Sequence, residues 1–307
     1  MAIYRESNAA PYLQPVPPVV EDVTSDGAPH ELSIGEIIRR ERRLSREQID
    51  QILQYQREKG VRFGEAAVAL GLASQQDVLF ALSQQFHYFY APDAKRGHGS
   101  ELVTATQPFS HQAESFRAIR AQLMMRLFGA QDDVRRALAV VSPDPGDGKT
   151  FFAANLGVVL SQLGGRTLVV DADLRGPRLH ELFGIEASAG LSSILSGRAE
   201  TSVIKQVPDL PSLYVLPVGV TPPNPVELVE RPAFALLMRE LLSKFDHVVV
   251  DTPAAVYGAD ATVIAARCGA ALVLARQGRS KVSRLQDLVA TLNNSPAKLA
   301  GVILNEY

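Results

Sequence analysis

The residues best suited to chemistry lie together in the loop SPDPGDGKT, residues 142–150. Gly146 and Gly148 have no Cβ atom, so backbone N–H groups can close around a polyphosphate there. The Lys149 ammonium group can then reach the β- and γ-phosphates, and the Thr150 hydroxyl can bind Mg²⁺. This loop predicts a nucleotide-binding site; the alternative interpretation is an ordinary tight turn.

Three carboxylates follow apolar runs further along the chain. Asp171 and Asp173 follow the run 166–170, and Asp251 follows the run 245–250. If both runs are strands of one parallel sheet, these carboxylates lie at its carboxyl edge, where open α/β sheets bind ligands. There they would hold Mg²⁺, directly or through water, and orient a nucleophile. The alternative is that Asp171 and Asp251 only cap the ends of strands.

Alternating strands and helices must position these groups. An apolar run before the loop and an apolar-periodic segment after it indicate a strand, a loop and a helix. We therefore predict an α/β fold: a P-loop NTPase domain with a mostly parallel sheet and helices on both faces. Strands are expected at 137–141, 166–170, 213–218, 245–250, 270–275 and 299–305, and helices at 109–128, 151–163, 178–197 (short helices), 226–244, 259–267 and 282–292.

Composition excludes several classes of protein. The 307 residues carry a formal net charge of −2, which gives no indication of nucleic-acid binding. The single cysteine, Cys268, cannot form an intramolecular disulfide and fits a reducing compartment. No apolar run approaches the roughly 20 residues of a membrane-spanning helix. We expect a cytoplasmic protein that reaches a membrane only through a partner.

The chain divides into four parts by composition and pattern. Residues 1–30 are rich in proline and typical of a disordered tail. Residues 31–90 contain an internal repeat, and 91–108 has the prolines and glycines of a linker. Residues 109–307 form the P-loop domain. We therefore expect two folded domains, of which the first is small and all-helical.

The internal repeat predicts two helical hairpins. IGEII near the start of the repeat region is echoed by FGEAA in its second half. Ser45 with Gln48, and Ser74 with Asp77, have the spacing of a capping box. Each repeat is therefore expected to be a short helix, a turn and a capped amphipathic helix.

Three motifs resemble those of one enzyme family. SPDPGDGKT, VVDADLR (residues 169–175) and VVDTP (residues 249–253) resemble the Walker A, Walker A′ and Walker B motifs of the bacterial tyrosine kinases of polysaccharide export. That family commonly replaces the first Walker A glycine, as Pro143 does here. The related cell-division and partitioning ATPases have an extra lysine in the region where Asp144 and Pro145 stand. The resemblance therefore favours the tyrosine kinases.

The resemblance extends over residues 109–307. ESFRAIR at 114–120 resembles the family's E-x-x-R-x-x-R oligomerisation motif, PPNPVEL its proline-rich turn and GVILN its last strand. It implies self-association through the helix that carries Glu114, Arg117 and Arg120. The alternative is an ion pair within the helix, which contributes little to stability.

The resemblance also implies a function and the residues that perform it. Members of the family are Mg-ATP-dependent protein-tyrosine kinases that phosphorylate themselves and regulate the chain length, polymerisation or export of extracellular polysaccharide. The implied catalytic residues are Lys149, which stabilises the transferred phosphoryl group, Asp173 and Asp171, which help to activate the tyrosine hydroxyl, and Arg175. The implied ATP contacts are Gly146, Asp147, Gly148, Lys149, Thr150, Phe151 and Asn305, and the implied Mg²⁺ ligands are Thr150, Asp173 and Asp251.

Two departures from the family's pattern leave other functions open. Its Walker B motif ends D-x-x-P, but Ala254 occupies the last position here. Family members usually end in a cluster of tyrosines, and here Tyr307 stands alone at the C-terminus. The alternatives are an assembly switch that hydrolyses ATP without phosphorylating tyrosine, and a signalling adaptor without enzymatic activity.

Two partners are implied as well. The helical repeat resembles the N-terminal module of type II secretion and type IV pilus ATPases, which binds cyclic di-GMP in some members. Those binders carry an arginine-led R-L-G signature in each repeat; Arg62 keeps the arginine in the second repeat, but Ser33 replaces it in the first. Cyclic di-GMP is therefore a candidate ligand, with protein docking as the alternative. The kinase resemblance implies a separate chain-length-determinant protein of the inner membrane as activator and anchor.

Overall fold

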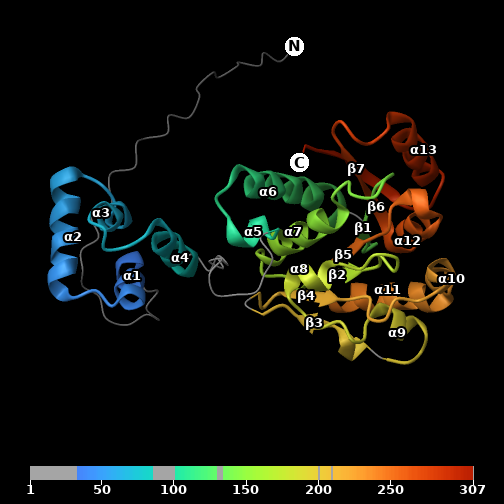
Figure 1. Ribbon diagram of the computed structural model, residues 1–307, viewed down its shortest axis with the longest axis horizontal. Coiled ribbons are helices and arrows are strands. Elements are labelled where there is room, and N and C mark those ends of the chain that lie inside the picture. Colours follow the sequence, from blue (N-terminus) through green and yellow to red (C-terminus); the bar gives the residue numbers. More distant parts are fainter. Residues whose placement is uncertain (1–32, 86–100, 130–133, 200, 209, 307) are drawn as a thin grey trace, which may run out of the picture. The chain divides into compact units, whose positions relative to one another are not determined.

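The computed structural model describes residues 33–85, 101–129, 134–199, 201–208 and 210–306 (Figure 1). The predicted tail, residues 1–30, and most of the predicted linker lie outside these ranges. The described residues form an all-helical part within 33–85 and an α/β part within 101–306.

The N-terminal part consists of four helices, as the repeat predicts. Ser45 caps the second helix: its Oγ accepts from the Gln48 N–H at 3.3 Å, and the Gln48 side chain accepts from the Ser45 N–H at 2.9 Å. Ser74 and Asp77 form the same reciprocal pair, so both capping boxes are confirmed. The helices are α1 (Ile34–Arg42), α2 (Arg46–Lys59), α3 (Phe63–Ala69) and α4 (Gln75–Gln85).

Gly64 lets α3 and α4 approach each other closely. A Cβ atom on Gly64 would lie 2.6 Å from a methyl group of Val78, and one on Gly35 would lie 3.5 Å from the Phe63 ring. Helix α1 contacts α4, and α2 contacts α3. Gly64 therefore has a packing role, whereas a Cβ atom on Gly35 would make only an ordinary van der Waals contact.

The α/β part is built on a sheet whose described strands run in the order β3-β4-β2-β5-β1-β6-β7. Every neighbouring pair is parallel except β3 and β4. The predicted fold class is confirmed, although the sequence pattern does not predict the short edge strand β3. The strands are β1 (Ala137–Val141), β2 (Thr167–Asp171), β3 (Lys205–Gln206), β4 (Leu213–Leu216), β5 (His247–Asp251), β6 (Gly269–Arg276) and β7 (Lys298–Asn305).

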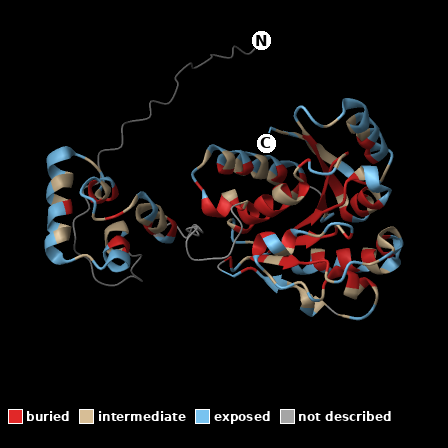
Figure 2. Cartoon of the chain, viewed as in Figure 1, coloured by how far each residue is buried: buried red, intermediate tan, exposed pale blue. Residues whose placement is uncertain are grey.

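Alternate residues of the central strands pack on opposite faces of the sheet. On β1, Ala137, Ala139 and Val141 belong to one apolar core, and Leu138 and Val140 to the other. Helices α9 to α13 cover the first core and α5 to α8 the second. Figure 2 shows the buried residues concentrated in the sheet and the helices beside it. Helices on both faces are thus confirmed.

The helices follow the predicted alternation with one exception. The segment 226–244 forms two helices, because the backbone at Arg231 is extended (φ −58°, ψ 146°) and Pro232 begins the second helix. A residue before proline is disfavoured in the helical region, so the single predicted helix is wrong. The helices are α5 (Val103–Thr106), α6 (His111–Leu123) with a π-helical continuation (Met124–Phe128), α7 (Lys149–Ser161), α8 (Leu179–Phe183), α9 (Leu191–Leu195), α10 (Pro225–Glu230), α11 (Pro232–Lys244), α12 (Asp260–Cys268) and α13 (Val282–Asn293).

Residues 101–108 belong to the α/β part and not to a linker. Leu102 is fully buried in the core that α7 shares. The Asn155 side chain of α7 accepts hydrogen bonds from both the N–H and the hydroxyl of Thr104, at 3.0 and 2.9 Å. The predicted linker boundary at residue 108 is therefore wrong, because a buried amide of α7 binds the backbone of this irregular segment.

Helix α7 carries the P-loop end into the interior of the domain. It is apolar on all sides and nearly all of its residues are buried, since it contacts the sheet on one side and α5 and α6 on the other. Such a helix has little freedom to move, so its first turn is a fixed platform. Across the described ranges, no helix has both the length and the apolar character that crossing a bilayer requires.

Candidate active site

The P-loop connects β1 to α7 and takes its shape from two glycines. Gly146 and Gly148 have φ angles of +80° and +99°, in the region that favours glycine. A Cβ atom on Gly148 would lie 2.5 Å from the Asn305 side-chain nitrogen, which donates to the Asp147 carbonyl at 3.0 Å. Gly148 also precedes the first residue of α7, so the free N–H groups of that helix end face the loop. This backbone fits a polyphosphate.

Lys149 is held at the loop by a neutral partner. The residue is 7% exposed, and its Nζ donates to Ser142 Oγ at 3.0 Å. Ser142 Oγ in turn donates to the Asp144 carbonyl at 2.8 Å. Because its hydrogen-bond partner is a hydroxyl, the ammonium charge stays available to an anionic phosphate.

A cavity of about 530 Å³ opens beside the P-loop, and we call it the catalytic cavity. Its walls come from the P-loop, from the segment after β2 and from the segment after β5. A space of this size accommodates phosphates together with an acceptor side chain. The residues that line it include Lys149, Thr150, Asp173, Arg175, Arg178 and Tyr257.

Asp251 ends β5 as a buried carboxylate without a hydrogen bond to any described residue. It is fully buried, and within the described part of the chain neither carboxylate oxygen has a hydrogen bond. Burial raises the pKa of Asp251 to about 7, while the nearby Thr150 hydroxyl and then the Lys149 charge lower it. An unsatisfied buried carboxylate costs free energy until a cation or donor completes it. This geometry suits a ligand of Mg²⁺.

Asp171 lies next to Asp251 in the parallel register of β2 and β5 but is fully hydrogen bonded. Its Oδ2 accepts from the Arg178 and Leu179 N–H groups at 3.1 and 3.0 Å, and its Oδ1 accepts from the Asp173 N–H at 3.2 Å. Burial, and then the charge of Asp251, raises the pKa of Asp171 well above its usual range. The geometry favours a role in shaping the loop after β2, and the catalytic role of Asp171 stays a prediction.

Asp173 lies in the wall of the catalytic cavity, as predicted. Its Oδ1 accepts from two backbone N–H groups of the next turn, at 3.0 and 3.2 Å. Arg175 makes two hydrogen bonds to the buried Asp260, of 3.0 and 3.3 Å. Arg178 pairs with Glu101. The two cavity arginines therefore already neutralise carboxylates of the same chain, and the catalytic role of Arg175 stays a prediction.

The end of β6 and the start of α13 brace the P-loop from its other side. Asp147 is fully buried, and its carboxylate accepts from Ser280 Oγ at 2.8 Å and from the Asp144 N–H at 3.0 Å. Arg276 donates to a P-loop carbonyl at 3.2 Å, and Arg284 pairs with Asp144. The Asp147 side chain thus shapes the loop and leaves its backbone to contact a nucleotide.

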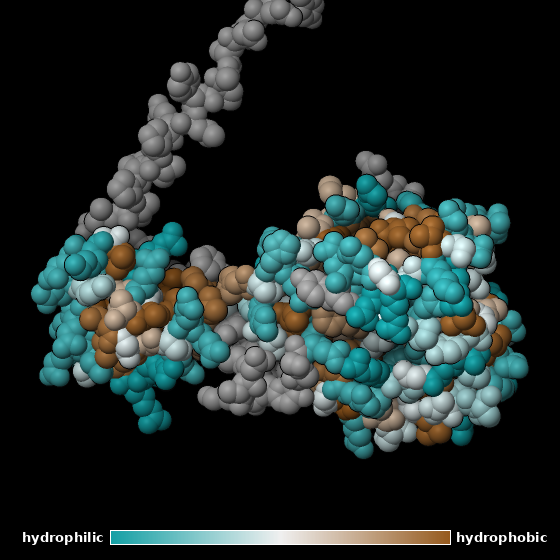
Figure 3. Space-filling model, turned by 45° about the horizontal axis from the view of Figure 1, so that its top comes forward, coloured by the Kyte–Doolittle hydropathy of each residue, from teal (hydrophilic) through white to brown (hydrophobic). Residues whose placement is uncertain are grey.

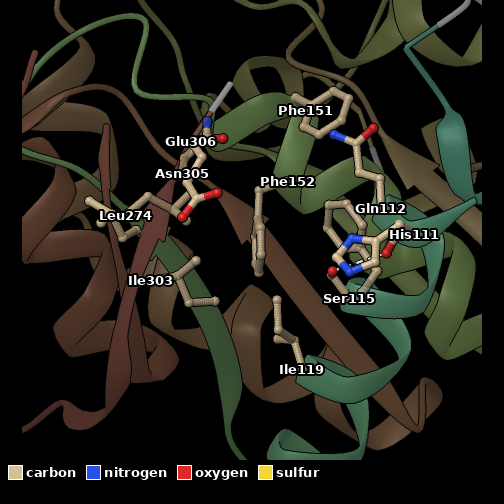
Figure 4. A pocket seen from close by; sticks show the side chains of 12 residues that line it. His111, Gln112, Ser115, Ile119, Phe151, Phe152, Leu274, Ile303, Asn305 and Glu306 are labelled. Atoms are coloured by element: carbon tan, nitrogen blue, oxygen red, sulfur yellow. Dashed lines mark hydrogen bonds between the residues drawn. The ribbon is translucent and has the colours of Figure 1, made fainter. Parts of the chain in front are cut away.

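A second cavity, of about 280 Å³, lies beside the first turn of α7 (Figure 4). Helix α6 lines one side with His111 and Ile119, and the end of β7 lines the other with Asn305. Phe151 and Phe152 lie between them. Apolar walls with a few polar groups suit a flat heterocycle. The predicted nucleotide contacts Phe151 and Asn305 thus meet at one cavity.

The helix expected to mediate self-association uses its arginines within the chain. Arg117 pairs with Glu114 at 2.6 Å and also donates to the Pro108 carbonyl. Arg120 donates to the Val159 carbonyl of α7 at 2.6 Å. The alternative, an ion pair within the helix, is confirmed for Glu114 and Arg117. Self-association through this helix stays a prediction.

Apolar side chains reach the surface of the α/β part, where Figure 3 shows them in brown. Val302 and Leu304 on β7 are 49% and 57% exposed, and Phe109, just before α6, is 58% exposed. Strand β7 is the last strand of the described sheet, and an apolar edge of this kind can pair with another chain. It is a candidate contact surface for a protein partner.

The predicted Mg²⁺ ligands are Thr150, Asp173 and Asp251. In the ranges that the structure describes, no group of three or more His, Cys, Asp or Glu side chains is placed to hold a metal by itself. Mg²⁺ in nucleotide sites takes one or two carboxylates and completes its shell with phosphate oxygens and water. The unpartnered oxygens of Asp251 therefore fit this cation.

Sequence reasoning missed several residues at the site. Arg178 follows Asp171 by seven residues, and the Asp171 hydrogen bonds turn it back to the cavity. Tyr257 lies three residues after Ala254, beyond the end of the predicted Walker B motif, so the motif does not indicate it. Ser280 meets Asp147 across 133 residues of sequence, so no local motif indicates it.

The chain is similar to known nucleotide-binding proteins and kinases. The CobQ/CobB/MinD/ParA nucleotide binding domain matches residues 138–307. The chain is 31% identical over 215 residues to tyrosine-protein kinase YwqD of Bacillus subtilis, which covers 69% of this chain and 90% of YwqD. It is 32% identical over 211 residues to tyrosine-protein kinase wzc of Salmonella typhimurium, which covers 69% of this chain and 29% of that relative.

A solved structure gives the same result. The kinase domain of Escherichia coli tyrosine kinase ETK matches with a TM-score of 0.62 and 30% identity, over 66% of this chain and 79% of that one. The chain thus spans less than a third of the length of Wzc but most of the length of YwqD. It belongs to the bacterial tyrosine-protein kinases, whose nucleotide-binding domain is of the CobQ/CobB/MinD/ParA family.

Proposed function

We propose that this protein transfers the γ-phosphoryl group of ATP to tyrosine hydroxyls. The observation that carries the proposal is the Asp251 carboxylate, fully buried and unpartnered in the described chain, on a strand that pairs with the P-loop strand β1. Asp251 and the Thr150 hydroxyl would hold Mg²⁺, which when bound with ATP neutralises charge on the phosphoryl group.

The other cavity residues would position and polarise the reactants. Lys149 would exchange its bond to Ser142 for the γ-phosphate and stabilise the charge that develops there. Asp173 would accept the proton of the tyrosine hydroxyl, since hydrogen bonds within the described chain engage only its Oδ1. Positioning and electrostatics would supply most of the rate enhancement, as in other phosphoryl transfers.

The second cavity would hold the adenine base. A base between Phe151 and the end of β7 would place its phosphates at the P-loop, because Asn305 lines this cavity and also donates to the Asp147 carbonyl. The aromatic rings supply a stacking surface, and polar groups at the rim can accept or donate hydrogen bonds. This proposal gives Phe151 and Asn305 the roles that the resemblance implies.

By its family, the kinase would act in polysaccharide export. We propose that it regulates chain length, polymerisation or export from the cytoplasmic side of the inner membrane, through a separate chain-length-determinant protein that activates it. The exposed apolar edge at Val302 and Leu304 supports a protein contact. Self-association through α6 would require Arg117 and Arg120 to exchange contacts within the chain for contacts with a neighbour.

The helical part would add a regulatory input. Cyclic di-GMP is its proposed ligand, with the exposed Arg62 as the phosphate contact. The packing role of Gly64 explains that glycine without a ligand, so the nucleotide must be tested directly. Titration with cyclic di-GMP by calorimetry, with Arg62→Ala as the comparison, tests it; heat that is the same for both proteins contradicts a role for Arg62.

The kinase proposal is tested on the purified chain with Mg-ATP, with and without the cytoplasmic segments of the membrane partner. Phosphotyrosine is read by mass spectrometry beside Lys149→Ala. Removal of the lysine is expected to lower the transfer rate by about 100- to 1000-fold, the cost of losing one charge-stabilising donor. Lys205→Ala, which changes an exposed lysine on β3, is the matched control and should retain the wild-type rate.

Two outcomes would contradict the proposal in different ways. Phosphate release that depends on Lys149 without any phosphotyrosine would favour the assembly switch that only hydrolyses ATP. Binding of cyclic di-GMP with no turnover of ATP would favour the adaptor.

A further inference from the structure

A tyrosine of this chain lies in the wall of its own catalytic cavity. Tyr257 lines that cavity together with Lys149, Thr150 and Asp173. It ends a short 3₁₀ helix, η3 (Ala255–Tyr257), that follows the Walker B strand. The residue is 51% exposed, and no hydrogen bond to its hydroxyl exists within the described part of the chain. A phenol placed there shares one cavity with the P-loop lysine and with the Asp173 carboxylate.

Backbone hydrogen bonds join the short helix that carries this tyrosine to the P-loop. The Ala255 N–H donates to the Ser142 carbonyl at 2.9 Å, and the Val256 N–H donates to the Pro143 carbonyl at 3.1 Å. The short helix therefore moves with the P-loop. Gly258 follows with a φ of +147°, so the chain turns sharply directly after the tyrosine.

No other tyrosine among the described residues has this position. Tyr214 packs edge-on against Phe245 at 5.4 Å between ring centroids and is only partly exposed. Tyr55 lies on α2 in the helical part. The remaining five tyrosines lie outside the described residues: Tyr4, Tyr12, Tyr88, Tyr90 and Tyr307.

Two arginines in the same wall would bind a phosphate on this tyrosine by exchanging the contacts that they make with Asp260 and Glu101. Arg175 and Arg178 line the cavity with Tyr257. A Cβ atom on Gly258, the next residue, would lie 3.8 Å from an Arg175 guanidinium nitrogen, so Arg175 is close to this turn. A phosphotyrosine carries about −1.5 to −2 charges and pairs strongly with arginine. The modified side chain would therefore be retained inside the cavity.

We propose that Tyr257 is phosphorylated by the active site of the same chain and that the product blocks the catalytic cavity. This inference rests on the proposed kinase function. The Tyr257 oxygen forms a bond to the γ-phosphorus of ATP, the bond from that phosphorus to the β–γ bridging oxygen breaks, and ADP leaves. The phenolic proton passes to Asp173. The phosphate then binds Arg175 and Arg178, where an acceptor tyrosine would otherwise enter.

The site and the chain that modifies it are tested in one reaction. The active full-length protein is incubated with Mg-ATP and an equal amount of tagged Lys149→Ala protein that retains Tyr257. The two chains are separated, and the peptide that contains Tyr257 is read by mass spectrometry. Phosphate on Tyr257 of the active chain, and not of the tagged chain, is the expected result.

Each other outcome overturns a defined part of the inference. Phosphate on other tyrosines with none on Tyr257 overturns the inference and leaves the kinase function intact. Absence of all phosphotyrosine overturns both. Phosphate on Tyr257 of the tagged chain overturns transfer within one chain.

The block is tested by separating protein with and without phosphate on Tyr257 and comparing transfer to an added Glu-Tyr copolymer. The phosphorylated form is expected to be several-fold slower. An equal or faster rate overturns the block. Removal of the phosphate with a tyrosine phosphatase should restore the rate, whereas damage to the protein during separation would not be reversed.

Discussion

The carboxyl ends of β2 and β5 carry the same residue in the same register but use it in opposite ways. Asp171 and Asp251 lie side by side in adjacent parallel strands, and both are fully buried. Three backbone N–H groups donate to Asp171. None donates to Asp251 within the described chain.

The difference in hydrogen bonding predicts different roles for the two carboxylates: one stabilises the loop, and the other binds a ligand. A buried carboxylate whose oxygens are all hydrogen bonded stabilises the loop around it, so its removal costs folding free energy. A buried carboxylate without partners costs folding free energy while it stays empty, and it persists where a ligand completes it. We therefore propose that Asp171 at the end of β2 supports the loop around it and that Asp251 at the end of β5 binds a cation.

The largest effect is expected from Asp251→Ala. Loss of this carboxylate should lower phosphoryl transfer by about 100- to 1000-fold, because Mg²⁺ loses its strand-end ligand. The melting temperature without nucleotide should not fall, since the wild-type carboxylate is unsatisfied there. Activity and differential scanning calorimetry measure the two effects separately. A large fall in stability without nucleotide would show that Asp251 is also scaffold.

Asp171→Ala should lower stability more than it lowers activity, the reverse of Asp251→Ala. The change leaves three N–H groups without their acceptor, at a cost of about 2–4 kcal/mol in the free energy of unfolding. Urea unfolding measures this cost, and Asp287→Ala on the exposed side of α13 is the matched control. If Asp171→Ala keeps wild-type stability but loses activity, the predicted catalytic role of Asp171 is correct and the scaffold role is wrong.

The sequence alone predicts where these two carboxylates lie but not how they differ. It predicts both strand ends, the P-loop and the parallel sheet, because apolar runs and glycines act locally. It assigns Asp171 and Asp251 similar chemistry, because spacing does not reveal which N–H groups fold back on a carboxylate. Those donors come from a loop whose path depends on the whole domain.

The same limit explains the errors in the fold. The apolar periodicity of residues 226–244 predicts one helix, although Pro232 within this segment favours a break. Residues 101–108 have no periodic pattern, and only the contact between Thr104 and Asn155 makes them part of the core. Tertiary hydrogen bonds therefore account for both the misplaced linker and the missed Ser280 brace.

Asp147 resembles Asp171, because it is a buried carboxylate that accepts hydrogen bonds from its own chain. Ser280→Ala would remove one of the two donors to this buried carboxylate, at a cost of about 1 kcal/mol. We expect a roughly fivefold higher KM for ATP with little change in kcat, because the phosphate loop loosens before the transition state is reached. Steady-state kinetics measure the split. Ser280→Thr keeps a hydroxyl and should restore KM; failure of this rescue, or an equal fall in kcat, would contradict the brace.

The smallest effect on phosphoryl transfer is expected at the other end of β5, where a buried side chain also lacks a hydrogen bond to any described residue but lies away from the catalytic cavity. His247 begins the strand about 13 Å from Asp251, and its buried Nδ1 has no hydrogen bond within the described chain. Burial lowers the pKa of His247 in the folded protein, so the unfolded chain takes up its proton first as the pH falls through about 6.5. Stability should therefore decline from pH 7.5 to pH 5.5.

His247→Gln should flatten this decline and leave the transfer rate at pH 7.5 unchanged. Melting temperatures across the pH range and the rate at pH 7.5 test both parts. Ligands bind at the carboxyl edge of a parallel sheet, and His247 lies at the amino edge. If His247→Gln abolished transfer in a folded protein, a buried group at the amino edge of the sheet would also be needed for activity. The position of Asp251 at the carboxyl edge would then be no argument for its function.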